Sequence, residues 1–127
     1  MKRGEIYLVN FGKKYNSEFV LPPVRDSALL HGKIRPALII QNDIANRNID
    51  KVAFKGVSVI PLTTNISGGN LRITIEKRDN LEATSEICIN ELCTLDLSRI
   101  DMTILLTKLT LEEQKEVDFK LLQHLVL

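Results

Sequence analysis

An arginine and a cluster of hydroxyl side chains are the residues of this sequence best suited to chemistry. Arg35 directly precedes a proline and four aliphatic residues, and a second apolar run ends in Thr63, Thr64, Asn65 and Ser67. Arginine offers fixed, bidentate donors to phosphate oxygens and keeps its charge. Such donors matter most where negative charge develops on a pentacovalent phosphorane. The residue types therefore indicate chemistry at a phosphodiester.

The segment that follows Arg35 is predicted to be a strand. Leu38, Ile39 and Ile40 favour strand, and a short apolar run bounded by turn residues is typical of a strand buried on both faces. Pro36 lacks an N–H group, which suits the first residue of a strand, and it pushes Arg35 into extended geometry. The alternative is a surface arginine at the end of a core strand, because arginine is usually exposed.

The other predicted elements are mostly short strands. We expect strands at residues 5–11, 35–41, 52–62, 71–76, 87–95 and 102–106, with a long loop at 12–34, a polar turn region at 42–50 and a helical turn at 97–100. Thr110 and Glu113 match a capping box that opens a helix reaching to about residue 126. Strands followed by one closing helix predict a mainly β fold, with a small, strongly bent antiparallel sheet or barrel packed by that helix.

The predicted sheet would bring the chemical residues together. If the strands at 35–41 and 52–62 pair antiparallel, the start of the first lies near the end of the second. Arg35 would then lie close to Thr63 and the hydroxyl groups that follow it. Asn65 and Ser67 also have a simpler interpretation as turn formers.

Length and composition limit the possible classes of protein. The 127 residues suit one domain spanning 1–127, and 44% hydrophobic with 26% charged residues is an ordinary globular balance. The sequence has no signal-peptide pattern and no apolar segment long enough to cross a bilayer, so we expect a cytoplasmic protein without membrane contact. Cys88 and Cys93, with His31 and His124, show no metal-ligand spacing, so we expect neither a metal nor a cofactor.

The charge is unevenly distributed along the chain. Residues 1–63 hold ten Lys or Arg against five Asp or Glu, a net +5, whereas residues 64–127 hold seven against eleven, a net −4, which recovers the total of +1. The basic half contains Arg35. A local basic surface attracts phosphates even when the total charge is close to zero.

Several short motifs in order along the chain resemble the MazF/PemK toxin family, the ribosome-independent mRNA interferases. The resemblance is carried by Arg3-Gly4-Glu5-Ile6-Tyr7, Arg35-Pro36-Ala37-Leu38-Ile39-Ile40-Gln41-Asn42-Asp43, Ile60-Pro61-Leu62-Thr63-Thr64-Asn65, Thr94-Leu95-Asp96 with Arg99, and the closing helix. It implies an SH3-like barrel, a homodimer and metal-independent cleavage of single-stranded RNA. In that chemistry the ribose 2′-OH attacks its own phosphate and leaves a 2′,3′-cyclic phosphate and a 5′-OH.

The resemblance also assigns roles to residues. It implies that Arg35 and Thr63 are catalytic, and RNA contacts are expected at Thr64, Asn65, Ser67 and Glu18. The expected partners are mRNA and a cognate antitoxin that lays a peptide across the dimer and its RNA groove, with DNA reached only indirectly through that antitoxin. The general base is left open, and the candidates by chemistry alone are Glu18, Asp43 and His31.

Two local features depart from the family pattern. The loop before Arg35 is about a dozen residues longer than usual, with Ser17-Glu18 in place of a Ser-Glu-Gln-like run. Asn90-Glu91-Leu92-Cys93 replaces the usual Glu-Gln-aliphatic-Arg, and both an acidic Glu91 and the loss of an arginine at Cys93 weaken attraction to phosphates.

These departures keep a non-catalytic alternative open. One version is a gyrase-binding toxin similar to the CcdB family, and the other is a degenerate binding module on the same fold. The gyrase poisons end in a Trp-Gly-aliphatic signature, whereas this chain ends Leu125-Val126-Leu127 and contains no tryptophan.

Overall fold

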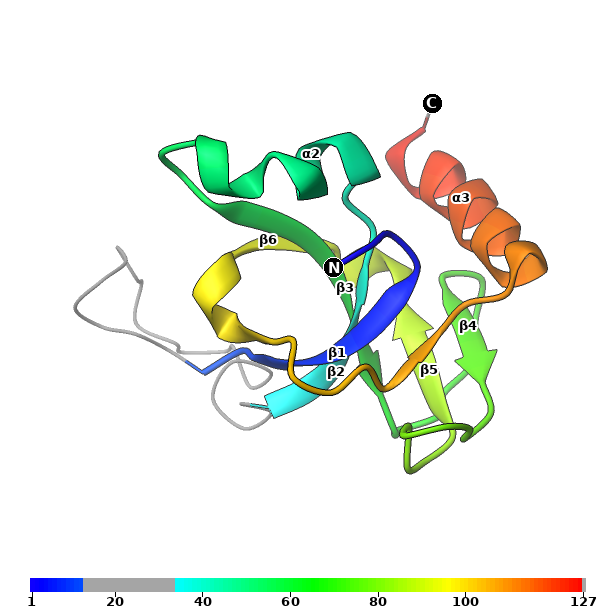
Figure 1. The fold of residues 1–127 in the computed structure, drawn as a ribbon. Coiled ribbons are helices and arrows are strands. Elements are labelled where there is room, and N and C mark those ends of the chain that lie inside the picture. Colours follow the sequence, from blue (N-terminus) through cyan, green and yellow to red (C-terminus); the bar gives the residue numbers. More distant parts are fainter. Residues whose placement is uncertain (13–33, 127) are drawn as a thin grey trace.

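The computed structural model describes residues 1–12 and 34–126. It has a mainly β fold whose last element is a long helix (Figure 1). The described strands are β1 (Glu5–Asn10), β2 (Ile34–Ile39), β3 (Gly56–Thr63), β4 (Arg72–Ile75), β5 (Ser85–Cys88), β6 (Cys93–Asp96), β7 (Ile100–Asp101) and β8 (Thr107–Lys108). The α-helices are α2 (Asp43–Arg47) and α3 (Leu111–Leu125), with 3₁₀ turns at Ile49–Lys51, Ile89–Glu91 and Leu97–Arg99. The predicted combination of short strands and a C-terminal helix is confirmed.

All of the described strand pairs are antiparallel, and the sheet bends strongly. The order across it is β4-β5-β3-β2-β1-β7, while β6 pairs with β3 and β8 pairs with β1. Figure 1 shows β6 curving over one side of this sheet while β4 and β5 extend on the other. Among the described residues the ladder of paired strands does not close, so the barrel implied by the resemblance is here an open, bent sheet.

Two apolar clusters lie on opposite faces of the central strands. Leu38 on β2 packs with Ile60 and with Val117 of α3 in one cluster, whereas Ala37 and Ile39 belong to the other. Alternate side chains of a strand point to opposite faces, so β2 is buried on both. The strand after Arg35 is therefore part of the core, as its apolar run predicted, and it gives that arginine a rigid base.

The capping box at the start of α3 forms as the sequence predicted. Thr110 Oγ1 accepts from the Glu113 N–H at 3.1 Å, and the Thr110 N–H donates to Glu113 Oε1 at 2.8 Å. No helix in the described part of the chain is long and apolar enough to cross a membrane.

The structure corrects three of the predicted elements. The polar region at 42–50 contains α2, because the Asn42 side chain accepts from the Ala45 N–H at 2.8 Å and so caps a helix. Residues 102–106 are not a strand. The Asp101 carboxylate accepts from the N–H and the hydroxyl of Thr103, which forms a turn between β7 and β8. The predicted strand at 87–95 is also interrupted by the 3₁₀ turn Ile89–Glu91.

Candidate active site

Strands β2 and β3 bring Arg35 beside Thr63. The antiparallel ladder pairs Ala37 with Pro61. Arg35 lies two residues before Ala37 on β2, and Thr63 lies two residues after Pro61 on β3, where β3 pairs with β5 instead. Arg35 Nε donates to the Leu62 carbonyl oxygen at 3.1 Å, which fixes the side chain against the end of β3. The start of β2 and the end of β3 therefore meet as the sequence predicted.

The guanidinium of Arg35 is held in position but keeps donors unused. The Cζ atom of Arg35 lies 5.7 Å from the centroid of the Phe11 ring, and the Arg35 side chain is 18% exposed. The Nη2 atom lies 3.9 Å from Glu91 Oε1, at the limit of an ion pair. Within the described residues the two Nη nitrogens make no hydrogen bond. Arg35 can therefore bind an incoming anion at its Nη edge.

Thr63 is half-buried and is oriented by the chain that follows it. Its Oγ1 accepts from the Asn65 N–H at 3.1 Å. A hydroxyl that accepts one bond still has its own hydrogen to donate. Thr64, Asn65 and Ser67 are exposed in the loop that continues to β4, so the predicted RNA-binding side chains face solvent next to Thr63.

The sequence reasoning missed Glu86, a buried carboxylate that holds this loop. Its side chain is 1% exposed and accepts from the N–H groups of Ser67 at 3.1 Å and Gly68 at 2.8 Å, and from Arg72 Nη1 at 2.9 Å. The pKa of Glu86 is lowered chiefly because the Ser67 N–H stabilises its charged form, although burial acts in the opposite direction. Glu86 and Cys88 share one face of β5 while Ile87 faces the core, and that alternation was the available signal.

The two cysteines lie in strands near this site and have no disulfide. Burial is the main reason that the pKa of each thiol is raised, for Cys93 to about 11, and Glu91 adds to the effect on both. Thiols with such pKa values are protonated near neutral pH and are poor nucleophiles. Cys88 is buried and Cys93 is partly buried, so both serve in the sheet as small hydrophobic residues.

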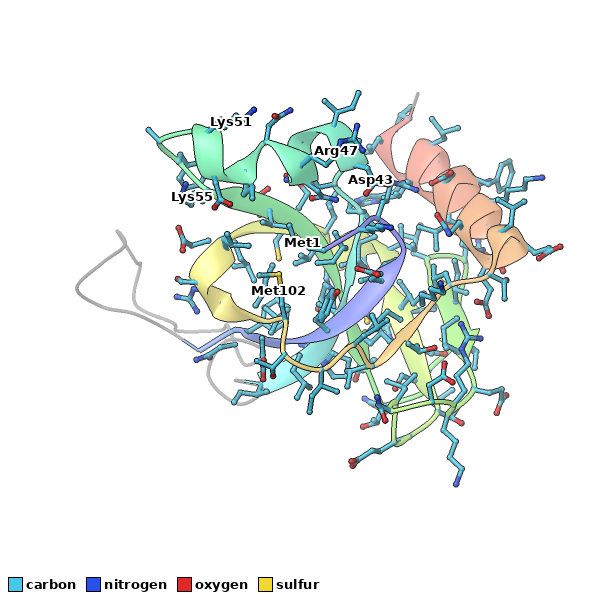
Figure 2. All side chains as sticks on the ribbon, in the orientation of Figure 1. Met1, Asp43, Arg47, Lys51, Lys55 and Met102 are labelled. Atoms are coloured by element: carbon cyan, nitrogen blue, oxygen red, sulfur yellow. The ribbon has the colours of Figure 1, made fainter. Side chains whose placement is uncertain are left out.

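Asp43, one of the three candidates for a general base, is not brought to Arg35. Asp43 accepts from the Arg3 N–H at 2.7 Å, which is the main reason that its pKa is lowered, and from Asn46 Nδ2 at 3.2 Å. It opens α2, beyond the end of β2 opposite to Arg35, and Figure 2 shows it on the same side of the molecule as Arg47 and Lys51. Glu18 and His31 lie outside the described residues. No group of three or more potential metal-ligating residues occurs in residues 1–12 and 34–126.

Comparisons with known proteins agree with the fold and identify the family. A family model described as PemK-like, MazF-like toxin of type II toxin-antitoxin system matches residues 2–125. The endoribonuclease EndoA of Bacillus subtilis (strain 168) is 30% identical over 122 residues, which cover 93% of this chain and 88% of that protein.

Solved structures of toxins have the same fold at lower sequence identity. The Mycobacterium tuberculosis toxin MazF-mt6 has a TM-score of 0.69 at 14% identity, with 97% of each chain covered. A MazE–MazF complex from Deinococcus radiodurans matches with a TM-score of 0.65 at 17% identity, covering 98% of this chain and 94% of that one. With the family model matching nearly the full length, the chain belongs to the PemK-like, MazF-like toxins of type II toxin–antitoxin systems.

Proposed function

We propose that this protein is an endoribonuclease toxin that cleaves single-stranded RNA, above all mRNA, at short specific sequences. The observation that carries the proposal is Arg35, whose Nη donors are unused in the described residues and whose Nε donates to the carbonyl oxygen of Leu62, the residue before Thr63. A fixed guanidinium and a hydroxyl at the ends of two adjacent strands are suited to a phosphodiester. Family membership and the 30% identity to EndoA support ribonuclease activity.

The two catalytic residues have distinct tasks in the proposed reaction. The ribose 2′-oxygen forms a bond to phosphorus, the bond from phosphorus to the 5′-oxygen breaks, and the products are a 2′,3′-cyclic phosphate and a 5′-OH. Arg35 donates to the equatorial oxygens as charge builds on the phosphorane, and Thr63 orients the phosphate or the 2′-OH through its free hydrogen. The 2′-OH loses a proton to a base, and the 5′-oxygen gains one from Arg35 or from water. We propose that this reaction is independent of metal ions. Glu18 and His31 remain the candidates for that base.

RNA is expected to lie along the loop after β3. Thr64, Asn65 and Ser67 present two hydroxyls and an amide to solvent beside the reacting phosphate. We assign them to RNA contacts, together with Glu18. Glu91 is the one negative side chain of the described residues paired with Arg35, and we expect it to leave that guanidinium when a phosphate binds.

The proposed partners follow from the relatives. Structures of similar toxins include an endoribonuclease in complex with its cognate antitoxin from a mycobacterial species. We propose a cognate antitoxin for this chain as well, and a cytoplasmic homodimer that reaches DNA only through the antitoxin.

The experiment that tests this function is RNA cleavage by the purified protein in EDTA. Wild-type protein should cut a panel of long RNAs at a few short sequences, and Arg35→Ala should leave the same RNAs intact with an unchanged circular dichroism spectrum. If wild-type protein leaves the whole panel intact, the proposal fails.

A second candidate is a toxin or binding module without catalysis. The ion pair between Arg35 and Glu91 favours it, because a carboxylate near the guanidinium reduces the attraction for phosphate. Gyrase retained by the immobilised protein, with no RNA cleaved in parallel, would support this candidate over the enzyme.

A further inference from the structure

The loop at residues 64–70 has little packing of its own. Its residues are exposed, and Gly68 and Gly69 have positive φ angles of 74° and 110°. Such φ angles suit glycine and give no side chain that could anchor the loop. The loop nevertheless follows Thr63 directly and carries the side chains proposed to meet RNA. Some other group has to hold it in one conformation.

The pairing of β3, β5 and β4 shows how the loop is held. Thr63 pairs with Glu86, and Arg72 on β4 pairs with Cys88. Residues that pair across a sheet, and residues two apart on one strand, share a face. Thr63, Glu86, Cys88 and Arg72 therefore lie on the face opposite to Ile87, which belongs to the core cluster with α3. The loop folds back over this polar face and buries the Glu86 carboxylate.

Glu86 accepts two hydrogen bonds from the loop and one from the sheet. Oε2 accepts from the Gly68 N–H, while Oε1 accepts from the Ser67 N–H and from Arg72 Nη1. Two consecutive N–H groups aimed at one anion form a concave backbone site for negative charge. A buried carboxylate with three donors is stable, whereas the same loop without it would leave those N–H groups unpaired.

We propose that Glu86 is a positioning residue that fixes the loop at residues 64–70 against the sheet, so that Thr64, Asn65 and Ser67 meet RNA beside Arg35 and Thr63. The inference rests on the proposed ribonuclease function. Glu86 itself does not touch the reacting atoms, because both of its oxygens already accept bonds from the protein. Its effect on RNA comes through the loop.

Glu86→Gln in the full chain tests this positioning role. The substitution replaces one carboxylate oxygen by an NH₂ group, which cannot accept a hydrogen bond from the N–H donors around it. Hydrogen exchange of the Ser67 and Gly68 amides should accelerate by about tenfold or more, as loss of bonds to a charged group implies. With a short RNA substrate, KM should rise on the order of tenfold while kcat changes by only about threefold or less, since misplaced binding groups weaken binding more than chemistry.

Glu113→Gln is the matched control, because Glu113 also binds an arginine and a backbone N–H group, but its partners Arg78 and Thr110 lie outside the loop at residues 64–70. It should lower stability while leaving KM unchanged. If both variants lower stability and neither changes KM, Glu86 is structural only and the inference is overturned. It is overturned equally if Ser67 and Gly68 keep their slow exchange in Glu86→Gln.

A second pair of variants leaves the buried carboxylate in place, in case Glu86→Gln does not fold. Ser67→Pro removes the Ser67 N–H donor, whereas Ser67→Ala keeps it and removes only the hydroxyl. We expect a larger rise in KM for proline than for alanine, and equal effects would contradict the positioning role.

If wild-type protein cuts no RNA, the proposed function fails and this inference falls with it. If wild-type protein cuts RNA and only the loop variants behave otherwise than expected, the inference alone fails.

Discussion

Arg78 and Arg35 are both half-buried, yet the protein uses them in opposite ways. Arg78 donates from every nitrogen, to Thr107 Oγ1, to the Lys108 carbonyl oxygen and twice to Glu113, with the shortest distance 2.7 Å. Within residues 1–12 and 34–126, the Arg35 side chain makes one hydrogen bond, at 3.1 Å, and an ion pair at 3.9 Å. A saturated arginine joins elements of the fold, whereas an unsaturated one on a rigid strand is available to a ligand. The number of unused donors thus separates a structural arginine from the one that we propose to be catalytic.

The largest expected effect is the loss of Arg35. Arg35→Ala should lower kcat/KM for RNA on the order of a thousandfold, because a guanidinium at a phosphoryl transition state contributes about that much or more. Thermal unfolding should change little, since the side chain makes a single hydrogen bond in the described residues. Arg78→Ala is the contrasting variant and should lower the unfolding temperature while the folded protein still cleaves RNA. Equal losses of activity in the two variants would remove the distinction.

Removal of the Thr63 hydroxyl should have the next largest effect. Thr63→Val keeps the shape of the side chain, and we expect kcat to fall about a hundredfold, as for the loss of one preorganised donor. Thr63→Ser retains the hydroxyl and should recover most of the activity in the same single-turnover assay. If valine and serine are equally active, Thr63 has no catalytic task.

Arg78, the structural arginine, should make the stability of the protein depend on pH. Its hydrogen bond to Glu113 is the main reason that the pKa of that carboxyl lies below the ordinary 4.5. A lowered folded-state pKa means that the stabilisation is fully present above about pH 4.5 and is lost as the pH falls through the folded-state value. Glu113→Gln should reduce the free energy of unfolding at pH 7 by roughly 1 kcal/mol, after allowance for solvent screening of this partly exposed pair. In urea unfolding the difference from wild type should shrink below pH 4.5, and a constant difference would contradict this assignment.

The smallest expected effect comes from relieving Arg35 of its acidic neighbour. Glu91→Gln should tighten RNA binding by about threefold, the size expected for a partly exposed ion pair. The gain should shrink at high salt, because exposed charges are screened. Binding to a labelled RNA that cannot be cut would measure it. Weaker binding in Glu91→Gln would show instead that the carboxylate contacts RNA directly.

The parts of the fold that follow from local rules were predictable from the sequence. The apolar run after Arg35 indicated a strand buried on both faces, Thr110 and Glu113 indicated the start of α3, and antiparallel pairing brought Arg35 to Thr63. Each of these depends on neighbouring residues or on one strand pair.

The parts that depend on the folded chain were not predictable in the same way. Glu86 is an acidic residue at the start of the short strand β5, and its partners Ser67 and Gly68 are 19 and 18 positions away in the sequence. Only the folding of the loop over β5 gives this carboxylate its bonds. The position of Phe11 was equally unpredictable, because its ring lies against the Arg35 guanidinium only when β1 pairs with β2.

The most direct test of the account uses one RNA oligonucleotide in two forms. One form is all-ribose, and the other has a single 2′-deoxyribose on the 5′ side of the cleaved phosphate. In EDTA, mass spectrometry should find a 2′,3′-cyclic phosphate and a 5′-OH from the first form, no cleavage of the second, and no cleavage of either by Arg35→Ala. Cleavage of the deoxy form, or products with a 5′-phosphate, would contradict attack by the 2′-OH at a phosphate held by Arg35.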